Sequence, residues 1–204
     1  MADHDPDPAR HNEPVLGADD GGSGVGVLLE IARLLQQNPI DLGVDIIFFD
    51  AEDYGESQSE DINSWCLGSQ YWSRNPHAKG YRASFGILLD MVGSKNARFT
   101  KEETSMAFAP AVMDKVWKLG QNMGYGNFFV DDKTKMLIDD HLFINRLTGI
   151  PTIDIINRPE GSATGFGHYW HTVKDNMDVI DKRTLRAVGQ TVLAVLYRES
   201  DGTF

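Results

Sequence analysis

The chain has 204 residues, of which 41% are hydrophobic, and this is enough to bury the core of one globular domain. Its 30 acidic and 19 basic residues give a formal charge of -11, so nucleic acid and anionic membranes are unfavourable partners. The single cysteine, Cys66, excludes an internal disulfide. No apolar run reaches transmembrane length, and the opening residues do not have the pattern of a signal peptide.

The first third of the chain predicts an irregular lead-in, a helix and a strand. Residues 1–16 are polar, proline-rich and aperiodic. Apolar residues then recur at helical spacing from Val25 to Leu35, and Asp20 stands just before this pattern, where an acid is by itself more often a helix cap than a metal ligand. The continuous apolar run from Val44 to Phe49 predicts a strand that is covered on both faces.

The rest of the chain alternates between helical patterns and buried strands. Residues 84–93 predict a strand that ends at Asp90, and residues 150–157 predict another, although Asp154 is an unexpected acid in it. Helices are predicted over 64–75, 111–124, 140–147 and 181–199.

This alternation predicts an α/β fold over residues 1–204, with a mostly parallel central sheet and helices on both faces. Because only three core strands are evident and sheets usually contain more, we expect the domain to lack its first amino-terminal strands.

Acidic and histidine side chains gather where the predicted strands end. They are Asp19 and Asp20, Asp50 to Asp53, Asp90, Asp139 and Asp140, and His168 with His171. Each group alone has an ordinary explanation as a helix cap, a solvated turn or a half-buried histidine. Because sites in such sheets form at the carboxyl ends of strands, the five groups together indicate a zinc site that keeps one position open for substrate.

Five stretches occur in an order that resembles the zinc-dependent aminopeptidase (M28-like) superfamily. They are "GADDGGSGVGVLLEIARLL", "IIFFDAEDYGE", "LLDMVGSKNARF", "IDDHLFINRLTGIPTIDII" and "YWHTVKDN". Within that superfamily the chain is most similar to the type II glutaminyl cyclases (glutaminyl-peptide cyclotransferases) of Bacteroidetes-like bacteria. The resemblance covers nearly the whole chain and implies a zinc-exopeptidase-like fold.

The resemblance also implies a set of ligands for one zinc ion. Asp20 matches the metal aspartate of the family, His171 matches the metal histidine, and Asp53 matches a second metal carboxylate that is a glutamate in many relatives. The two-zinc peptidases take a further histidine from an upstream H-x-D motif, which His4 does not fit.

The remaining implied roles concern proton transfer and substrate binding. Glu52 matches the general acid/base, and Asp90 and Asp139 match members of the acid network of the cyclases. Phe166 and Trp170 match aromatic walls of the substrate pocket, with Trp65 as a looser match for the same role. Asp50 and Glu56 are expected to be turn or surface residues. Asp154 stands where animal cyclases have a histidine, so that part of the network is not carried over.

The implied activity converts an amino-terminal glutamine of a peptide or protein to pyroglutamate, with release of ammonia. A zinc-dependent aminopeptidase and an inactive, truncated domain that binds peptide or metal stay open as alternatives. The bacterial relatives also imply export to the periplasm.

Overall fold

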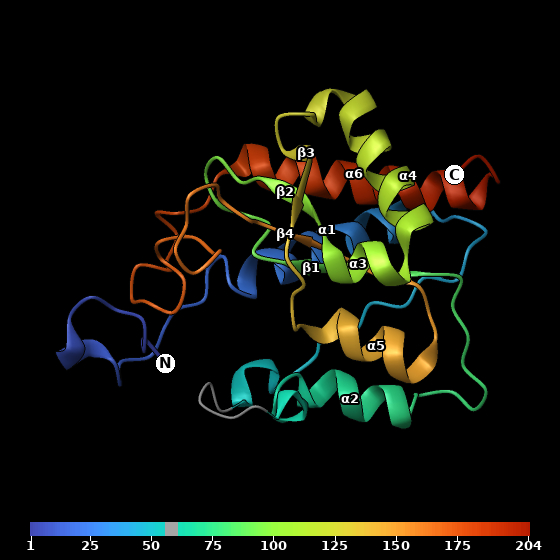
Figure 1. Ribbon diagram of the computed structural model, residues 1–204. Helices are drawn as coiled ribbons and strands as arrows, with labels where there is room; N and C mark the ends of the chain where they lie inside the picture. The colour runs from blue at the N-terminus through green and yellow to red at the C-terminus, as the bar shows by residue number, and fades with distance from the viewer. Residues whose placement is uncertain (56–60) are drawn as a thin grey trace.

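Four parallel-paired strands lie at the centre of the computed structural model, which describes residues 1–55 and 61–204 (Figure 1). Strands β1 (Gly86–Asp90) and β4 (Thr152–Ile156) pair in parallel and in register over their whole length. Strands β2 (Phe99–Glu102) and β3 (Phe129–Thr134) form a second parallel pair, and a bridge between Phe99 and Asn157 joins β2 to the end of β4. The predicted α/β class with parallel strands is confirmed.

Helices cover these strands on two sides. They are α1 (Gly22–Gln37), α2 (Leu67–Arg74), α3 (Glu103–Phe108), α4 (Pro110–Gly120), α5 (Asp140–Thr148) and α6 (Lys182–Ser200). Figure 1 shows α6 above β1 and β4 and α5 below them, with α2 packed on α5 from outside. Helix α1 packs against β1 and α6. None of these helices is both long and apolar enough to cross a membrane, over the residues that the structure describes.

The main apolar core lies between the strands and helices α1, α4 and α6. Trp117 of α4 is almost fully buried, and its indole nitrogen donates to the carbonyl oxygens of Phe99 and Val130, at 3.2 and 3.0 Å. The Phe129 ring meets the Trp117 ring edge-on with centroids 5.4 Å apart. Because Trp117 buries its apolar surface and also satisfies its one donor, it fixes α4 against β2 and β3.

The prediction of a buried strand from Val44 to Phe49 is wrong. These residues pair with no other strand in the described part of the chain, and the Phe48 side chain is 51% exposed. The segment is held by side chains, since Tyr81 donates to the Asp45 carboxylate and the Phe49 ring packs on Trp72. An apolar run becomes a strand only where a neighbour takes its backbone hydrogen bonds, and here it borders an open cavity of about 670 Å³ facing β1.

Strands β2 and β3 were not predicted from the sequence. Their residues, "FTKE" and "FVDDKT", include several charged side chains and no apolar run. They pair because Phe99 and Phe129, both fully buried, anchor the two strands to the core at their first residues. A single buried aromatic at the start of a short polar stretch is too weak a pattern to indicate a strand.

A fully buried pair, Glu102 and His141, links α3 to α5. Glu102 accepts hydrogen bonds from the backbone nitrogen atoms of Thr104 and Ser105, so it caps α3. Its Oε1 also lies 3.2 Å from Nε2 of His141, and both side chains are 0% exposed. Burial alone would raise the pKa of Glu102, but the His141 bond and the Ser105 contacts outweigh it and hold the pKa below its usual value, which keeps the carboxylate ionised.

Replacing Glu102 by glutamine is expected to lower the free energy of unfolding by about 1.5–3 kcal/mol, because a neutral amide accepts the buried hydrogen bonds from Thr104 and Ser105 less strongly than a carboxylate does. Denaturant unfolding followed by circular dichroism measures this loss. Glu103→Gln is the matched control: Glu103 is exposed, and the variant should stay within about 0.5 kcal/mol of wild type. Equal stability of the two variants would show that the buried pair contributes nothing to the fold.

Candidate metal centre and acid network

Three side chains from distant parts of the chain meet at one point. Nε2 of His171 lies 3.3 Å from Oδ2 of Asp53 and 3.7 Å from Oδ2 of Asp20. The nearest ligand atoms of all three residues lie within 4.8 Å of one another. Asp20 precedes α1, Asp53 belongs to the short 3-10 turn Glu52–Tyr54, and His171 lies in the long loop between β4 and α6.

The local structure around Asp20 leaves its carboxylate free for this cluster. The neighbouring Asp175 carboxylate accepts from the backbone nitrogen atoms of both Asp19 and Asp20, at 2.8 and 3.1 Å. The buried Asp19 carboxylate accepts from the Gly93 nitrogen and the Tyr169 hydroxyl. The residue that caps α1 is Gly21, with no side-chain capping bond in the described structure, so the interpretation of Asp20 as a helix cap is wrong.

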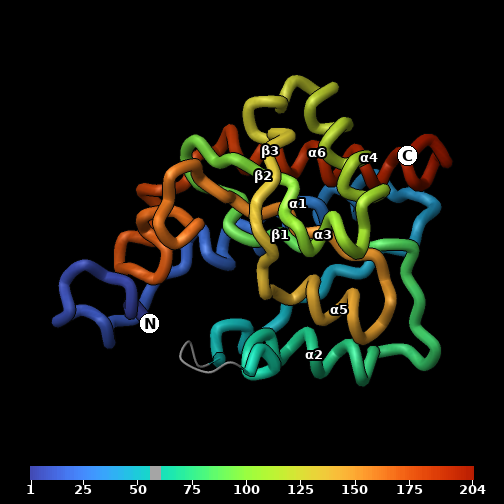
Figure 2. Tube along the Cα trace, in the orientation of Figure 1, coloured from blue at the N-terminus to red at the C-terminus, as the bar shows by residue number. Residues whose placement is uncertain are grey.

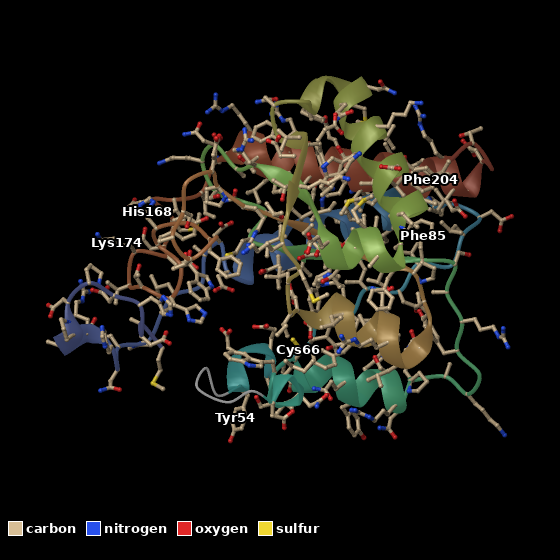
Figure 3. All side chains as sticks on the ribbon, in the orientation of Figure 1. Tyr54, Cys66, Phe85, His168, Lys174 and Phe204 are labelled. Carbon is tan, nitrogen blue, oxygen red and sulfur yellow. The ribbon has the colours of Figure 1, made fainter. Side chains whose placement is uncertain are left out.

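A strained turn directs Glu52 and Asp53 toward the cluster. Ala51 has a positive φ of 51°, which is unfavourable for a residue with a Cβ atom. Backbone nitrogen atoms at the start of α2 hold the turn: Cys66 donates to the Glu52 carbonyl and Leu67 to the Ala51 carbonyl. In Figure 3 Cys66 lies on the inner side of this region and Tyr54 points outward. Asp50 is exposed, as predicted, and Glu56 lies outside the described residues.

Glu52 stands beside the metal-ligand cluster, among other acids. Its carboxylate, the Cys66 sulfur and the Asp139 carboxylate offer atoms that lie within 4.8 Å of one another. Burial, and then the charges of Asp139, Asp53 and Asp90, raise the pKa of Glu52 to about 11. Glu52 therefore holds a proton near neutral pH unless a nearby cation lowers its pKa.

Asp90 and Asp139 are the other predicted acids, and the structure brings both close to Glu52. Asp90 ends β1, and Asp139 precedes α5, where its carboxylate accepts from the Asp140 nitrogen. Asp139 is thus a helix cap and a member of the acid cluster at once. Burial raises the pKa of both carboxyls well above the usual value, with smaller contributions from neighbouring acids.

The acid network extends deeper than the sequence analysis predicted. Asp139 offers an atom within 4.8 Å of ligand atoms of His141 and Asp154, and all three residues are buried. Asp154 lies in the middle of β4 with no exposed surface. The acid Asp154 inside an apolar strand is the only sequence signal for these deeper members of the network. His141 gives no signal beyond its position after Asp139 and Asp140.

The pKa of Asp154 is also raised well above its usual value, first by burial and then by Asp90 and Glu102. A carboxyl whose pKa is higher in the folded than in the unfolded protein stabilises the fold below about pH 4, and this stabilisation is lost as the pH rises. We therefore expect the metal-free protein to unfold more easily at pH 8 than at pH 5. Asp154→Asn should weaken this dependence.

Chemical denaturation across this pH range measures the effect. Asp41, which is exposed, provides a control, since Asp41→Asn should leave the slope of stability against pH unchanged. A slope that Asp154→Asn does not alter would contradict the assignment of a proton to this buried carboxyl.

Aromatic rings line the loop that carries His171. The Trp170 ring stacks on the His171 imidazole with centroids 4.0 Å apart, and the Phe166 ring lies 4.6 Å from Trp170. The Arg158 guanidinium covers the Phe166 ring at 4.6 Å. Trp65 instead packs against Gly55, where a Cβ atom would come within 2.1 Å of its ring. The structure thus brings Phe166 and Trp170 to the metal-ligand cluster, and the role of Trp65 stays a prediction.

The chemistry of the metal-ligand cluster fits a divalent cation. Nε2 of His171 is buried and has no hydrogen-bond partner among the described residues. Burial and the Asp53 charge raise the pKa of Asp20 to about 6, so the cluster concentrates negative charge that a cation would neutralise. Two carboxylates and one imidazole nitrogen are ligands that zinc takes in sites with an open position.

Comparison with known proteins bears on what this arrangement does. The sequence pattern of peptidase family M28 matches residues 2–196. The chain belongs to peptidase family M28. Among curated proteins, the chain is similar to the glutaminyl-peptide cyclotransferase of Gloydius blomhoffii, with 27% identity over 87% of this chain and 54% of that protein.

Solved structures are more similar to this M28 chain. The crystal structure of Bacteroides thetaiotaomicron glutaminyl cyclase bound to N-acetylhistamine is 58% identical, with a TM-score of 0.93 over 97% of this chain and 68% of the other. The structure of a Zn-dependent exopeptidase from Parabacteroides distasonis is 52% identical, also with a TM-score of 0.93, over 97% of this chain and 68% of the other. The chain spans about half the length of the curated cyclotransferase and about two thirds of each solved chain.

Proposed function

We propose that the protein is a zinc-dependent glutaminyl cyclase that converts an amino-terminal glutamine of peptides or proteins to pyroglutamate. The observation that carries the proposal is the meeting of Asp20, Asp53 and His171, with the carboxyl of Glu52 beside them. The 58% identity to a structure of a glutaminyl cyclase supports the same activity. Asp20, Asp53 and His171 would hold one zinc ion, which supplies a Lewis acid for the side-chain amide of the substrate.

The reaction needs little beyond positioning and proton transfer. The α-amine nitrogen of the glutamine forms a bond to its own side-chain amide carbon, and the bond from that carbon to the amide nitrogen breaks, giving ammonia. Because both groups belong to one residue, the protein only has to hold them at attack distance. The stacked rings of Phe166 and Trp170 are placed to exclude water from the small ring that forms.

Glu52 is the residue that can carry the proton. Its carboxylate takes a proton from the attacking amine and returns it to the leaving nitrogen, so the group ends in its starting state. Asp139 and Asp90 lie close enough for their charges to raise the pKa of Glu52. The acid cluster thereby tunes the basicity of Glu52.

The direct test measures ammonia release from a peptide that begins with glutamine, with the zinc-loaded protein. We expect ammonia and a peptide that is 17 mass units lighter, as the loss of NH₃ dictates, and no free amino acid. A zinc-dependent aminopeptidase, which the similarity to a Zn-dependent exopeptidase keeps as the second candidate, would release free glutamine instead. Mass spectrometry separates the two products.

An inactive domain that binds peptide or metal is the third candidate. Its support is the exposed apolar surface beside β1, where Phe48 of the unpaired segment is 51% exposed. A folded, zinc-loaded protein that yields neither ammonia nor free amino acid would favour this candidate. We also propose a periplasmic location, which rests on the resemblance to exported bacterial cyclases and is checked by cell fractionation.

A further inference from the structure

His171 has a backbone conformation that needs external support. Its φ of 53° is in the left-handed region, which a residue with a Cβ atom rarely adopts. The residue lies in the irregular loop that follows β4, and the imidazole must still present Nε2 to Asp20 and Asp53. Ring stacking with Trp170 restricts the plane of the imidazole but does not distinguish its two nitrogen atoms.

The irregular lead-in supplies this support from 168 positions away. Figure 2 shows the amino-terminal segment beside the loop that carries His171. Oδ1 of Asp3 lies 3.0 Å from Nδ1 of His171. The backbone nitrogen of His4 donates to the His171 carbonyl at 3.1 Å, and the Asp5 carboxylate accepts from the Val173 nitrogen at 3.3 Å. The lead-in therefore contacts the ring of His171, its carbonyl oxygen and the backbone at Val173.

The lead-in is itself anchored. Ala2 is fully buried and its nitrogen donates to the Glu13 carbonyl, while Asp5 is 5% exposed and accepts from the Asp7 nitrogen. The His4 ring meets the Trp170 ring edge-on at 4.4 Å. Asp3 is thus held in place from both sides along the chain, which a freely moving terminus could not do.

The Asp3 contact favours a proton on Nδ1 of His171. A carboxylate only accepts hydrogen bonds, so it selects the form with the proton on Nδ1. Nε2, which is buried and lies near Asp20 and Asp53, then has its lone pair available for a cation that these carboxylates would also bind. Histidines that bind metals ordinarily donate their second nitrogen to such an acceptor, which fixes the ring and increases its basicity.

We propose that Asp3 is the positioning residue of His171, and that residues 2–5 hold this imidazole in the orientation and tautomer that bind zinc. The proposal rests on the proposed metal site. It assigns a function to a segment whose sequence shows no periodic pattern.

The same atoms could instead form a second cation site. Asp3, His4 and His171 offer ligand atoms within 4.8 Å of one another. That arrangement would need Nδ1 of His171 unprotonated, with both nitrogen atoms of one imidazole bound to different ions. The contact of Nδ1 with a single exposed carboxylate favours the positioning role, in which the protein binds one zinc ion.

Two measurements on the 204-residue protein test the proposal. The first is zinc affinity, by competition with a chromophoric chelator. We expect Asp3→Ala to weaken binding about 10- to 100-fold, as loss of an outer partner of a metal histidine does, and Asp3→Asn to weaken it less because the amide oxygen still accepts. Asp7→Ala is the matched control, because Asp7 belongs to the same lead-in but accepts from the Ala9 nitrogen. It should bind zinc as tightly as wild type.

The second measurement is the ¹⁵N chemical shift of the His171 ring nitrogen atoms in the metal-free protein. Wild type is expected to show a proton on Nδ1, and Asp3→Ala to shift the proton toward Nε2, which still faces Asp20 and Asp53. Because this readout needs no metal, it separates failure of the proposed metal site from failure of the role of Asp3. A wild-type protein that binds no zinc contradicts the proposed metal site. An unchanged tautomer and an unchanged zinc affinity in both Asp3 variants overturn the role of Asp3. Two zinc equivalents in wild type and one in Asp3→Ala would also overturn it.

Discussion

Replacing Glu52 by glutamine is expected to reduce kcat for cyclisation by about 10²- to 10⁴-fold while zinc affinity stays close to that of wild type. Glutamine has nearly the same shape and fills the same space, but it cannot take up a proton. Because Glu52 lies beside the proposed ligands and is not one of them, the cation should still bind. Steady-state ammonia release and a chelator competition measure the two quantities on one preparation.

The nearby Asp50 provides the control for this variant. It lies two residues before Glu52, outside the turn, and is exposed, so Asp50→Asn should retain both activity and zinc affinity. A Glu52→Gln protein that loses zinc as strongly as a ligand variant would show that Glu52 binds the metal. A protein that keeps full kcat would show that another group carries the proton.

Replacing Asp53 by alanine should remove zinc binding itself. Loss of a direct zinc ligand should lower zinc affinity by more than the roughly 10- to 100-fold expected for loss of a residue that only positions a ligand. After the substitution the site keeps only one carboxylate and one imidazole. The Asp53 side chain is 55% exposed, so the fold should be retained. Zinc content after dialysis and thermal unfolding of the metal-free protein measure these effects separately.

Asp53→Glu is the matched variant, since many relatives have glutamate at this position. It should retain zinc and measurable turnover. If Asp53→Ala kept the zinc affinity of wild type, the three-residue ligand set would be incorrect, whatever the variant did to activity.

The sequence predicted those elements whose patterns are local. The helix over 181–199 was confirmed as α6 because its apolar positions recur at helical spacing and Asp181 caps it. The strand over 150–157 was confirmed as β4 because all five of its residues are buried. The predicted strand from Val44 to Phe49 was wrong although its apolar run is as continuous as that of β4. Strand formation also requires a neighbouring strand, and the sequence pattern does not reveal whether one is present.

The residues of the candidate site also divide into those that the sequence predicted and those that it did not. Asp20, Asp53 and His171 could be predicted because they lie in motifs that resemble a known family, and the structure brings their ligand atoms together. Asp3 could not be predicted in its proposed role, because a contact over 168 positions leaves no trace in periodicity or spacing. Glu102 was not predicted as a buried residue, because a glutamate in a short polar stretch is ordinarily exposed, whereas this one has no exposed surface.

The most direct test of the central claim is a crystal structure of the zinc-loaded protein with anomalous diffraction at the zinc absorption edge. We expect one anomalous peak, bonded to the carboxylates of Asp20 and Asp53 and to Nε2 of His171 at about 2.0–2.2 Å. A peak bound elsewhere, or none at these three side chains at full zinc occupancy of the protein, would contradict it.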